Sequence, residues 1–598
     1  MSSKKKTLKY LNKDFNSFRN DLIEYAKTHF PDANQDFSES GIPGMFIDLG
    51  AYVGDVLSFY LDHQFGEMFL ESARELKSVK RIIKQFQYNA TPPTPSVVNC
   101  MFSIEVPVNN VNNKPDTKYL LTLKRGTLLS SDSGVVFELQ DDVDFSDYSM
   151  DALTISEVNS TGTPTSYIIE KGGHCISGQI TTYNYELGDY EDFRKVELDD
   201  EDITSVISVT DSNGNEYYQV DNLSEDTVFE AVESLDDASG LVPYVLKLKY
   251  VPFRFVSVYD IENRKTTLQF GSGKQSIVDD DIVPDPSQYA VPMYGKSTIS
   301  SFSINPNQFL KTKTYGISPY STTLTARCRV GGGLSHNVAE GSVNTIDSAL
   351  VEFPSVSDVS NSVKNMVFST LNVRNDIGAS GGEARQSLDD IRRTMGGHYA
   401  SQKRIVTSED YLARVYSMPS KFGRVYRAMV SPSTIPFVTE LRVLSRDSEG
   451  NLIQSPTFLK NNLKTYLSRY ISINEHVEIF DTKIINLGLN FNILVKSGFN
   501  KDEILSNALS DLYDYFNVMN FQIGQPILLS DVVDVIYNLD GVISVFDLEF
   551  INLSDNFDGR KYSDDQYNIN VNKNVLLCPS DSMFEFKYLE YDIKGKVS

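Results

Sequence analysis

The 598-residue sequence contains no tryptophan, four cysteines and six histidines. The four cysteines are far apart, and no two of them form a CxxC pair. This spacing indicates neither a zinc site nor a disulfide framework, and it fits a reducing compartment. No two histidines have the HExxH spacing of zinc proteases. We therefore expect no metal site and no cofactor.

Long apolar runs are also missing. No uninterrupted apolar stretch approaches 18 residues, and the first residues lack the apolar core of a signal peptide. We therefore expect no membrane partner and synthesis in a cytosol. Acidic residues outnumber basic ones by 80 to 55, which gives a net charge of −25. That charge argues against nucleic-acid binding, because phosphate contacts need clustered Lys and Arg.

The pattern of apolar and polar residues changes along the chain. Helical periodicity ends at a proline cluster, alternating β-type runs follow, and helices and strands then mix. The fold class predicted is α+β multidomain, with an N-terminal helical bundle segment, a large all-β middle region and C-terminal α+β domains. The domains assigned are N-terminal helices at 1–91, β-rich domains at 92–330, a mixed connecting region at 331–400, an α+β domain at 401–550 and a β tail at 551–598.

The most informative segment is 44–86, which we expect to be helical with a break near Glu71–Arg74. Its apolar residues recur in steps of three and four, so they share one helix face. With the apolar flank of that face, the stripe is three positions wide, too broad for a two-stranded coiled coil. It predicts a bundle of at least three helices. The predicted partner-binding residues are Met45, Leu49, Tyr52, Val56 and Phe59 in the seam, Phe46, Val53 and Tyr60 on the apolar flank, and Asp48, Asp55 and Asp62 on the acidic flank.

The acidic flank allows two interpretations. Acidic residues on a helix are usually a solvated face, but Asp48, Asp55 and Asp62 lie beside the apolar stripe rather than opposite it. Charges in that position select partners and register in bundles. If the three carboxylates pair with basic residues, we expect those residues on another chain.

The body offers more local predictions. An amphipathic helix is expected at 8–30, and a hairpin turn at Asp211–Asn215. Thr407 begins a helix with a capping box completed by Asp410. In the C-terminal part, a strand pair is expected over Val477–Val495, and helices should cover one face of an antiparallel sheet.

The candidates for chemistry are weak. The segment Phe270–Gln275 resembles a phosphate loop but lacks its first Gly and its closing Ser or Thr, so a turn between strands is expected. The acidic loop Asp211–Asn215 has its Gly too early for a calcium loop. No Gly-x-Ser-x-Gly elbow is present. We expect no catalytic residues and no enzymatic activity.

Several short motifs occur in a specific order along the chain. In the C-terminal half they are Leu268–Gly273, Arg329–Gly341, Gly381–Arg392, Val406–Tyr411, Ile523–Gln525 and Gly541–Val542. Together these motifs resemble the baseplate J-like proteins of contractile-tailed phages and related injection machines. Two further segments, Asp55–Arg74 and Met583–Gly595, are similar to the large wedge subunits of T4-like phage baseplates.

This resemblance implies a structural subunit of a baseplate wedge in the virion, assembled in the host cytoplasm. It implies a dimer within each wedge, whose N-terminal helices join a helix of a larger wedge protein in a three-helix bundle. It also implies a small sheath-attaching partner, and C-terminal contacts that link neighbouring wedges into a ring around the hub. The resemblance further implies that this ring rearranges when the sheath contracts.

Two other interpretations remain open from the sequence. The tyrosine-rich β region suggests a carbohydrate-binding or hydrolysing tail protein. Alternatively, the N-terminal helices pack on the chain's own β domain.

Overall fold

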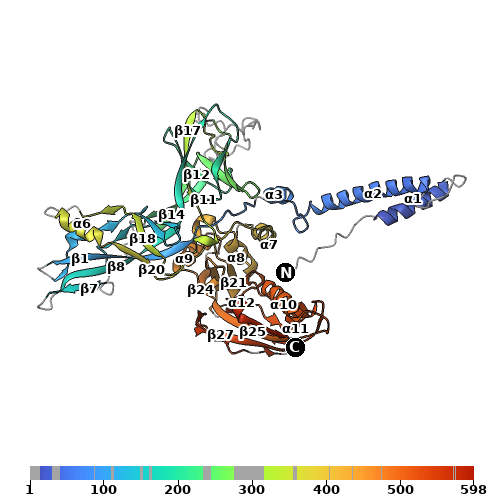
Figure 1. Ribbon diagram of the computed structural model, residues 1–598. Coiled ribbons are helices and arrows are strands. Elements are labelled where there is room, and N and C mark those ends of the chain that lie inside the picture. The colour runs from blue at the N-terminus through green and yellow to red at the C-terminus, as the bar shows by residue number, and fades with distance from the viewer. Residues whose placement is uncertain are drawn as a thin grey trace.

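A computed structural model describes the protein, and Figure 1 confirms the α+β multidomain fold. Helices at the N-terminus precede a β-rich region and a C-terminal part with helices and strands. The described residues are 14–597 except for 30–40, 87, 110–112, 149–152, 160–163, 234–243, 275–314, 355–359, 403, 432, 434, 473, 570 and 573.

The N-terminal part forms three helices. These are α1 (Phe15–His29), α2 (Ile42–Gly66) and α3 (Leu76–Gln85). Pro43 stands in the first turn of α2, where its missing N–H has no intrahelical partner to lose. The predicted break is confirmed but is longer than expected, from Glu67 to Glu75. Residues 8–13 and 30 of the predicted first helix lie outside the described residues.

The first β unit is built on an eight-stranded sheet with the order β18-β4-β5-β8-β1-β2, in which β20 pairs with β1 and β7 with β8. Alternate residues of β1, such as Phe102 and Ile104, are buried in its core. The 331–400 stretch supplies two of its strands. The strands are β1 (Val97–Asn109), β2 (Lys114–Pro115), β4 (Leu128–Ser131), β5 (Val136–Leu139), β7 (Leu153–Val158), β8 (Pro164–Ser177), β18 (Val343–Ser348) and β20 (Asn372–Asn375).

Smaller elements complete this unit. A three-stranded sheet has the order β19-β3-β6, and a helix packs near β1. The segment before β3 begins with a short 3₁₀ turn. The elements are η1 (Thr117–Tyr119), β3 (Thr122–Leu123), β6 (Val143–Asp144), β19 (Val351–Glu352) and α6 (Asn361–Ser369).

A second β unit is inserted into the first. Its chain leaves at Gly178 and returns at Gly331, and both glycines have φ near +100°. A Cβ at Gly178 would lie 2.8 Å from the carbonyl oxygen of Val330, so the two crossings require glycine. The sheet has the order β10-β16-β15-β12-β11-β17-β9, and a separate hairpin pairs β13 with β14. The strands are β9 (Gln179–Leu187), β10 (Lys195–Glu201), β11 (Ile203–Asp211), β12 (Glu216–Gln219), β13 (Thr227–Glu233), β14 (Tyr244–Tyr250), β15 (Arg254–Asp260), β16 (Lys265–Phe270) and β17 (Thr322–Val330).

The predicted hairpin in this unit is confirmed. Strands β11 and β12 are antiparallel, and Gly214 between them has φ +85°. The Asp211 carboxylate accepts hydrogen bonds from the backbone N–H groups of Asn213 and Asn215, both at 2.9 Å. The carboxylate thus builds the turn, as Asx turns do.

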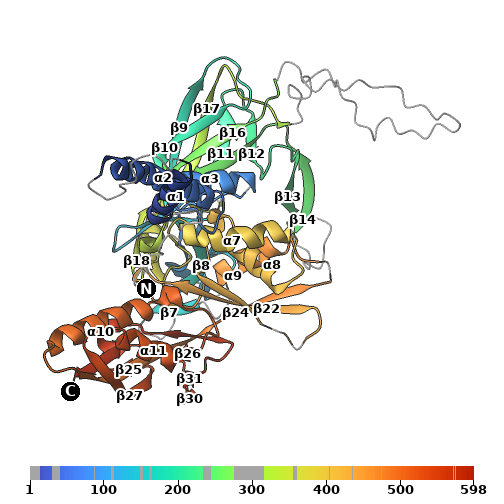
Figure 2. The same cartoon turned by 90° about the vertical axis from the view of Figure 1, so that its right-hand side faces the viewer.

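The central unit combines helices with a four-stranded sheet of order β21-β22-β23, in which β24 also pairs with β22. The Thr407–Asp410 capping box at the start of α8 is confirmed. Figure 2 shows α7, α8 and α9 together in this part of the molecule. The elements are α7 (Leu388–Ser401), α8 (Ser408–Tyr416), α9 (Thr457–Leu467), β21 (Arg427–Ser431), β22 (Val438–Arg446), β23 (Leu452–Ile453) and β24 (His476–Asp481).

The C-terminal unit has a four-stranded sheet with β25 at its centre. The expected strand pair over 477–495 is wrong, because β24 pairs with β22 whereas β25 pairs with β27. The sheet is mixed rather than antiparallel, since β32 and β33 run parallel to β25. The main elements are β25 (Lys483–Val495), α10 (Lys501–Tyr515), α11 (Leu529–Tyr537), β27 (Val542–Leu553), β32 (Ser582–Glu585), α12 (Leu589–Asp592) and β33 (Ile593–Val597).

Segments that are distant in sequence meet at a buried junction between these units. Thr94, from the proline segment, donates its N–H to the Glu383 carbonyl at 2.9 Å and accepts the Gly333 N–H at 2.9 Å. The Asn337 amide donates to the Gly382 carbonyl and accepts the Gly382 N–H, both at 2.9 Å. A Cβ at Gly382 would lie 2.6 Å from the Asn337 side chain, so only glycine fits. Two motifs that carry the resemblance therefore build one joint.

A buried carboxyl lies where the central and C-terminal units meet. Glu585 accepts hydrogen bonds from the Leu452 N–H at 2.6 Å and from the Asn486 amide at 2.8 Å. Burial raises the pKa of Glu585 to about 7, against the opposing effect of these two donors. The neighbouring Asp447 also raises this pKa, and Lys587 lowers it.

This pKa predicts a pH-dependent stability of the interface. The ordinary pKa of Glu is 4.5, so between about pH 4.5 and pH 7 the folded state holds a proton that the unfolded state has lost. The contribution of the protonated Glu585 carboxyl to the stability of the folded state is therefore fully present below pH 4.5. It is lost as the pH rises through 7. At about 1.4 kcal/mol per pKa unit, we expect a loss of roughly 3 kcal/mol.

Hydrogen exchange of β25 and β32 at pH 5 and pH 7.5 measures this change. Glu585→Gln should flatten the pH dependence, whereas Glu549→Gln, an exposed residue on β27, should leave it unchanged. An equal pH dependence in wild type and Glu585→Gln would contradict the assignment.

Candidate interaction site on the helical arm

Helices α1 and α2 form a structure that we call the arm. Figure 1 shows the two helices side by side and projecting away from the rest of the molecule. The face of α2 toward α1 is made of small residues. A Cβ at Gly54 would lie 3.1 Å from the Phe18 ring, and one at Gly50 would lie 3.3 Å from the Leu22 side chain. Glycine at these positions lets α1 approach the backbone of α2 closely.

The other side of α2 is apolar and exposed. Of the predicted partner-binding residues, Val56 and Phe59 are half-buried and the rest of the apolar set is at least half exposed. A face of this size on a helix is unusual in a protein that works alone. The apolar residues that are at least half exposed are Met45, Phe46, Leu49, Tyr52, Val53 and Tyr60.

The exposed face is wider than the predicted stripe. Ile42, Leu57 and Leu61 are 71%, 58% and 62% exposed and extend it. At 100° per residue these positions widen the apolar face to roughly half of the helix circumference. The sequence carried a signal for two of them, because Leu57 and Leu61 continue from Val53 in steps of four.

The acidic flank is partly used within the chain. The Arg19 guanidinium donates to the Asp48 carboxylate at 2.6 Å, which fixes α1 against α2. The expectation that a basic partner of Asp48 would lie on another chain is therefore wrong. Asp55 and Asp62 lie one and two heptads further along the same flank and are partly exposed.

The position of the arm shows whether it packs on the β units, and the composition of α2 shows whether it suits a membrane. Its projection leaves the apolar face of α2 uncovered by the β units. Helix α3 does pack on the second β unit, because Val79 shares a core cluster with Tyr259 and Lys80 pairs with Asp260 at 2.5 Å. By length and composition, α2 could cross a membrane. Aspartates at 48, 55 and 62 interrupt its apolar residues. Asp55 lies at its middle, however, and a carboxylate at a bilayer centre costs roughly 2.5–3.5 kcal/mol. A protein environment suits this helix better.

The weak candidates for chemistry have structural roles. A Cβ at Gly271 would lie 2.1 Å from the carbonyl oxygen of Gly316, and the Gly273 N–H donates to that carbonyl at 2.8 Å. The loop therefore packs against its own chain, and its last predicted residue, Gln275, lies outside the described residues. In the described part of the chain, no group of three His, Cys, Asp or Glu side chains is placed to hold a metal ion.

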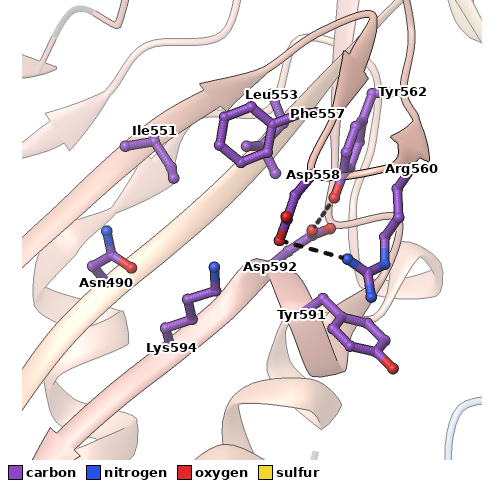
Figure 3. Close-up of a pocket in the computed structure, with 10 residues that line it drawn as sticks. All are labelled: Asn490, Ile551, Leu553, Phe557, Asp558, Arg560, Tyr562, Tyr591, Asp592 and Lys594. Atoms are coloured by element: carbon purple, nitrogen blue, oxygen red, sulfur yellow. Dashed lines mark hydrogen bonds and ion pairs between the residues drawn. The ribbon is translucent and has the colours of Figure 1, made fainter.

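A small pocket opens on the C-terminal sheet (Figure 3). Its two carboxylates are engaged by their own chain, because Asp592 accepts the Tyr562 hydroxyl at 2.6 Å and Asp558 lies 3.9 Å from the Arg560 guanidinium. Burial raises the pKa of Asp592, and the residue is only 4% exposed. The pocket therefore offers no accessible acid and base pair for glycoside hydrolysis.

Comparison with known proteins singles out the arm and α3. Residues 14–85 match the family model of the bacteriophage baseplate protein, N-terminal domain. This match places the chain in the baseplate of a virion tail and supports a structural baseplate protein.

Other comparisons add less. No curated protein matches the chain. A chain of the cryo-EM structure of the anti-feeding prophage (AFP) baseplate, 6-fold symmetrised, is similar at 9% identity over 98% of this chain and 99% of that chain. Its TM-score of 0.28 is too low to support an argument.

Proposed function

We propose that this protein is a non-enzymatic wedge subunit of a contractile tail baseplate and that its arm binds other chains in a shared helical bundle. The observation that carries the proposal is the apolar face of α2, exposed on a projecting arm within the segment that matches a baseplate domain. Burial in a bundle would remove this face from water and stabilise the assembly.

The proposed partners follow from the same face. Because α1 already covers the small-residue side, the remaining surface can receive helices of a second copy and of a larger wedge protein. Met45, Leu49, Tyr52, Val56 and Phe59 form the centre of this contact. Phe46, Val53 and Tyr60 form one flank, and Asp55 lies on the other flank, where it would face basic groups of the partner chains.

The larger role is proposed from the resemblance of the C-terminal half to J-like proteins. We propose that the central and C-terminal units contact neighbouring wedges and close them into a ring around the hub. A small sheath-attaching protein would bind near the bundle, and rearrangement of the ring would accompany sheath contraction.

Electron microscopy of the intact tail tests the proposal. We expect α2 in contact with helices of other chains, and the isolated protein to have the mass of a dimer. Leu49 and Tyr52 facing solvent in the assembled baseplate would contradict the bundle. Cleavage of a polysaccharide by the purified protein would favour the carbohydrate interpretation instead.

A further inference from the structure

The arm meets the rest of the molecule at a short segment, the elbow (residues 67–75), between α2 and α3. We call the part of the molecule that follows the elbow the body. Helix α3 belongs to it, because its buried residues Val79, Ile82 and Ile83 share a core cluster with Ile391 and Met395 of α7. The direction of the arm relative to the body is therefore decided in the elbow.

One side of the elbow is held by a carboxylate. Glu67 is only 9% exposed and accepts hydrogen bonds from the N–H groups of Arg74 at 2.7 Å and Glu75 at 3.1 Å. Burial alone would raise the pKa of Glu67, but these donors and the Ser78 hydroxyl outweigh it and lower the pKa. The carboxylate thus ties the end of α2 to the start of α3, where the N-terminal N–H groups favour negative charge.

The other side of the elbow is held by a guanidinium from α7. Arg392 donates to the carbonyl of Leu70 at 3.0 Å and to that of Ala73, and Asp389 holds the same guanidinium at 2.6 Å. Ala73 is fully buried. Helix α7 begins at Leu388, five residues after Glu383 of the junction, so the elbow is bonded to an element that is continuous with the junction.

We propose that Glu67 and Arg392 form a clamp that fixes the direction of the arm relative to α7. A displacement of the junction and α7 would then move the arm, rather than being absorbed by a flexible elbow. The clamp is a property of the single chain, so it does not depend on which partners the arm binds.

Electron paramagnetic resonance distance measurements on the full chain test the clamp. Spin labels on Lys27→Cys of α1 and Glu409→Cys of α8, both exposed positions, report the arm and the body. Cys578→Ser removes the one partly exposed native cysteine. An excess of unlabelled protein restricts the signal to distances within one chain. We expect Glu67→Ala and Arg392→Met each to widen the distance distribution at least twofold, and Glu67→Gln to widen it less because its amide oxygen still accepts one N–H.

Two neighbouring residues give matched controls. Glu71→Ala changes an exposed carboxylate of the same elbow, and Arg393→Met changes the next arginine of α7, which is 57% exposed. Both should leave the distribution as narrow as in the wild type. If Glu67→Ala does not fold, Arg392→Met still tests the clamp from outside the elbow. An unchanged width in folded Arg392→Met, or equal widening in the controls, would overturn the proposal.

Discussion

Replacing Leu49 and Val53 together by aspartate should abolish assembly of the baseplate while leaving the chain folded. Both side chains are at least half exposed in the isolated chain, so its own core loses little. In a bundle, each would contribute about 1.5–3 kcal/mol by burial. Two carboxylates placed there would cost several kcal/mol more, because a buried charge without a partner is strongly unfavourable. A total loss of about 5 kcal/mol or more weakens binding by over a thousandfold.

The measurement is the fraction of complete baseplates seen by electron microscopy, together with the mass of the purified variant. The control is Ile155→Asp with Val158→Asp on β7, two apolar residues of similar exposure, at 53% and 59%. This pair adds the same charge to an already acidic chain but lies outside the arm. Normal assembly of the Leu49 and Val53 variant would contradict the bundle, and equal failure of the control would show a general effect of charge.

The arm shows how far periodicity could predict this structure. Steps of three and four located the helix and its apolar face correctly, because both depend on local spacing. The same pattern could not show which side of α2 the chain itself covers. That side is made of Gly50, Gly54 and their small neighbours, and contact there depends on close backbone approach rather than on apolar side chains. Arg19 as the partner of Asp48 was missed for the same reason.

In the body, elements were predicted well and their connections poorly. Strand β24 ends at Asp481 and β25 begins at Lys483, so neighbouring strands were expected to pair, yet they enter different sheets. The insertion of one β unit into another was also invisible, because pairing between segments far apart leaves no local pattern. Gly178 and Gly331 lie where the chain enters and leaves the inserted unit. The need for glycine there is evident only from the structure, in which the two chain segments pass close to each other.

Replacing Arg446 by methionine should open the junction. Its guanidinium donates to the Glu383 carboxylate, with the Nε contact at 3.1 Å, and lies 4.0 Å from the centre of the Tyr426 ring. The side chains of Arg446 and Glu383 are 11% and 8% exposed, so removing the arginine leaves a buried charge without its partner. Breaking a buried pair in this way costs about 3–5 kcal/mol.

A single free energy of unfolding is not defined for a chain with several units, so local hydrogen exchange is the appropriate measurement. Exchange in Gly333–Asn337 and at Thr94 should accelerate in Arg446→Met. Combining it with Glu383→Gln should recover most of the protection, because the uncompensated charge is then gone.

Arg374→Met, which breaks an exposed pair with Glu170, should cost at most about 1 kcal/mol. Unchanged exchange in Arg446→Met would mean that the hydrogen bonds of Thr94, Asn337 and Gly382 hold the junction without the ion pair. Recovery in the double variant would instead show that the pair acts through its charge, and that the joint between the units depends on keeping Glu383 neutralised.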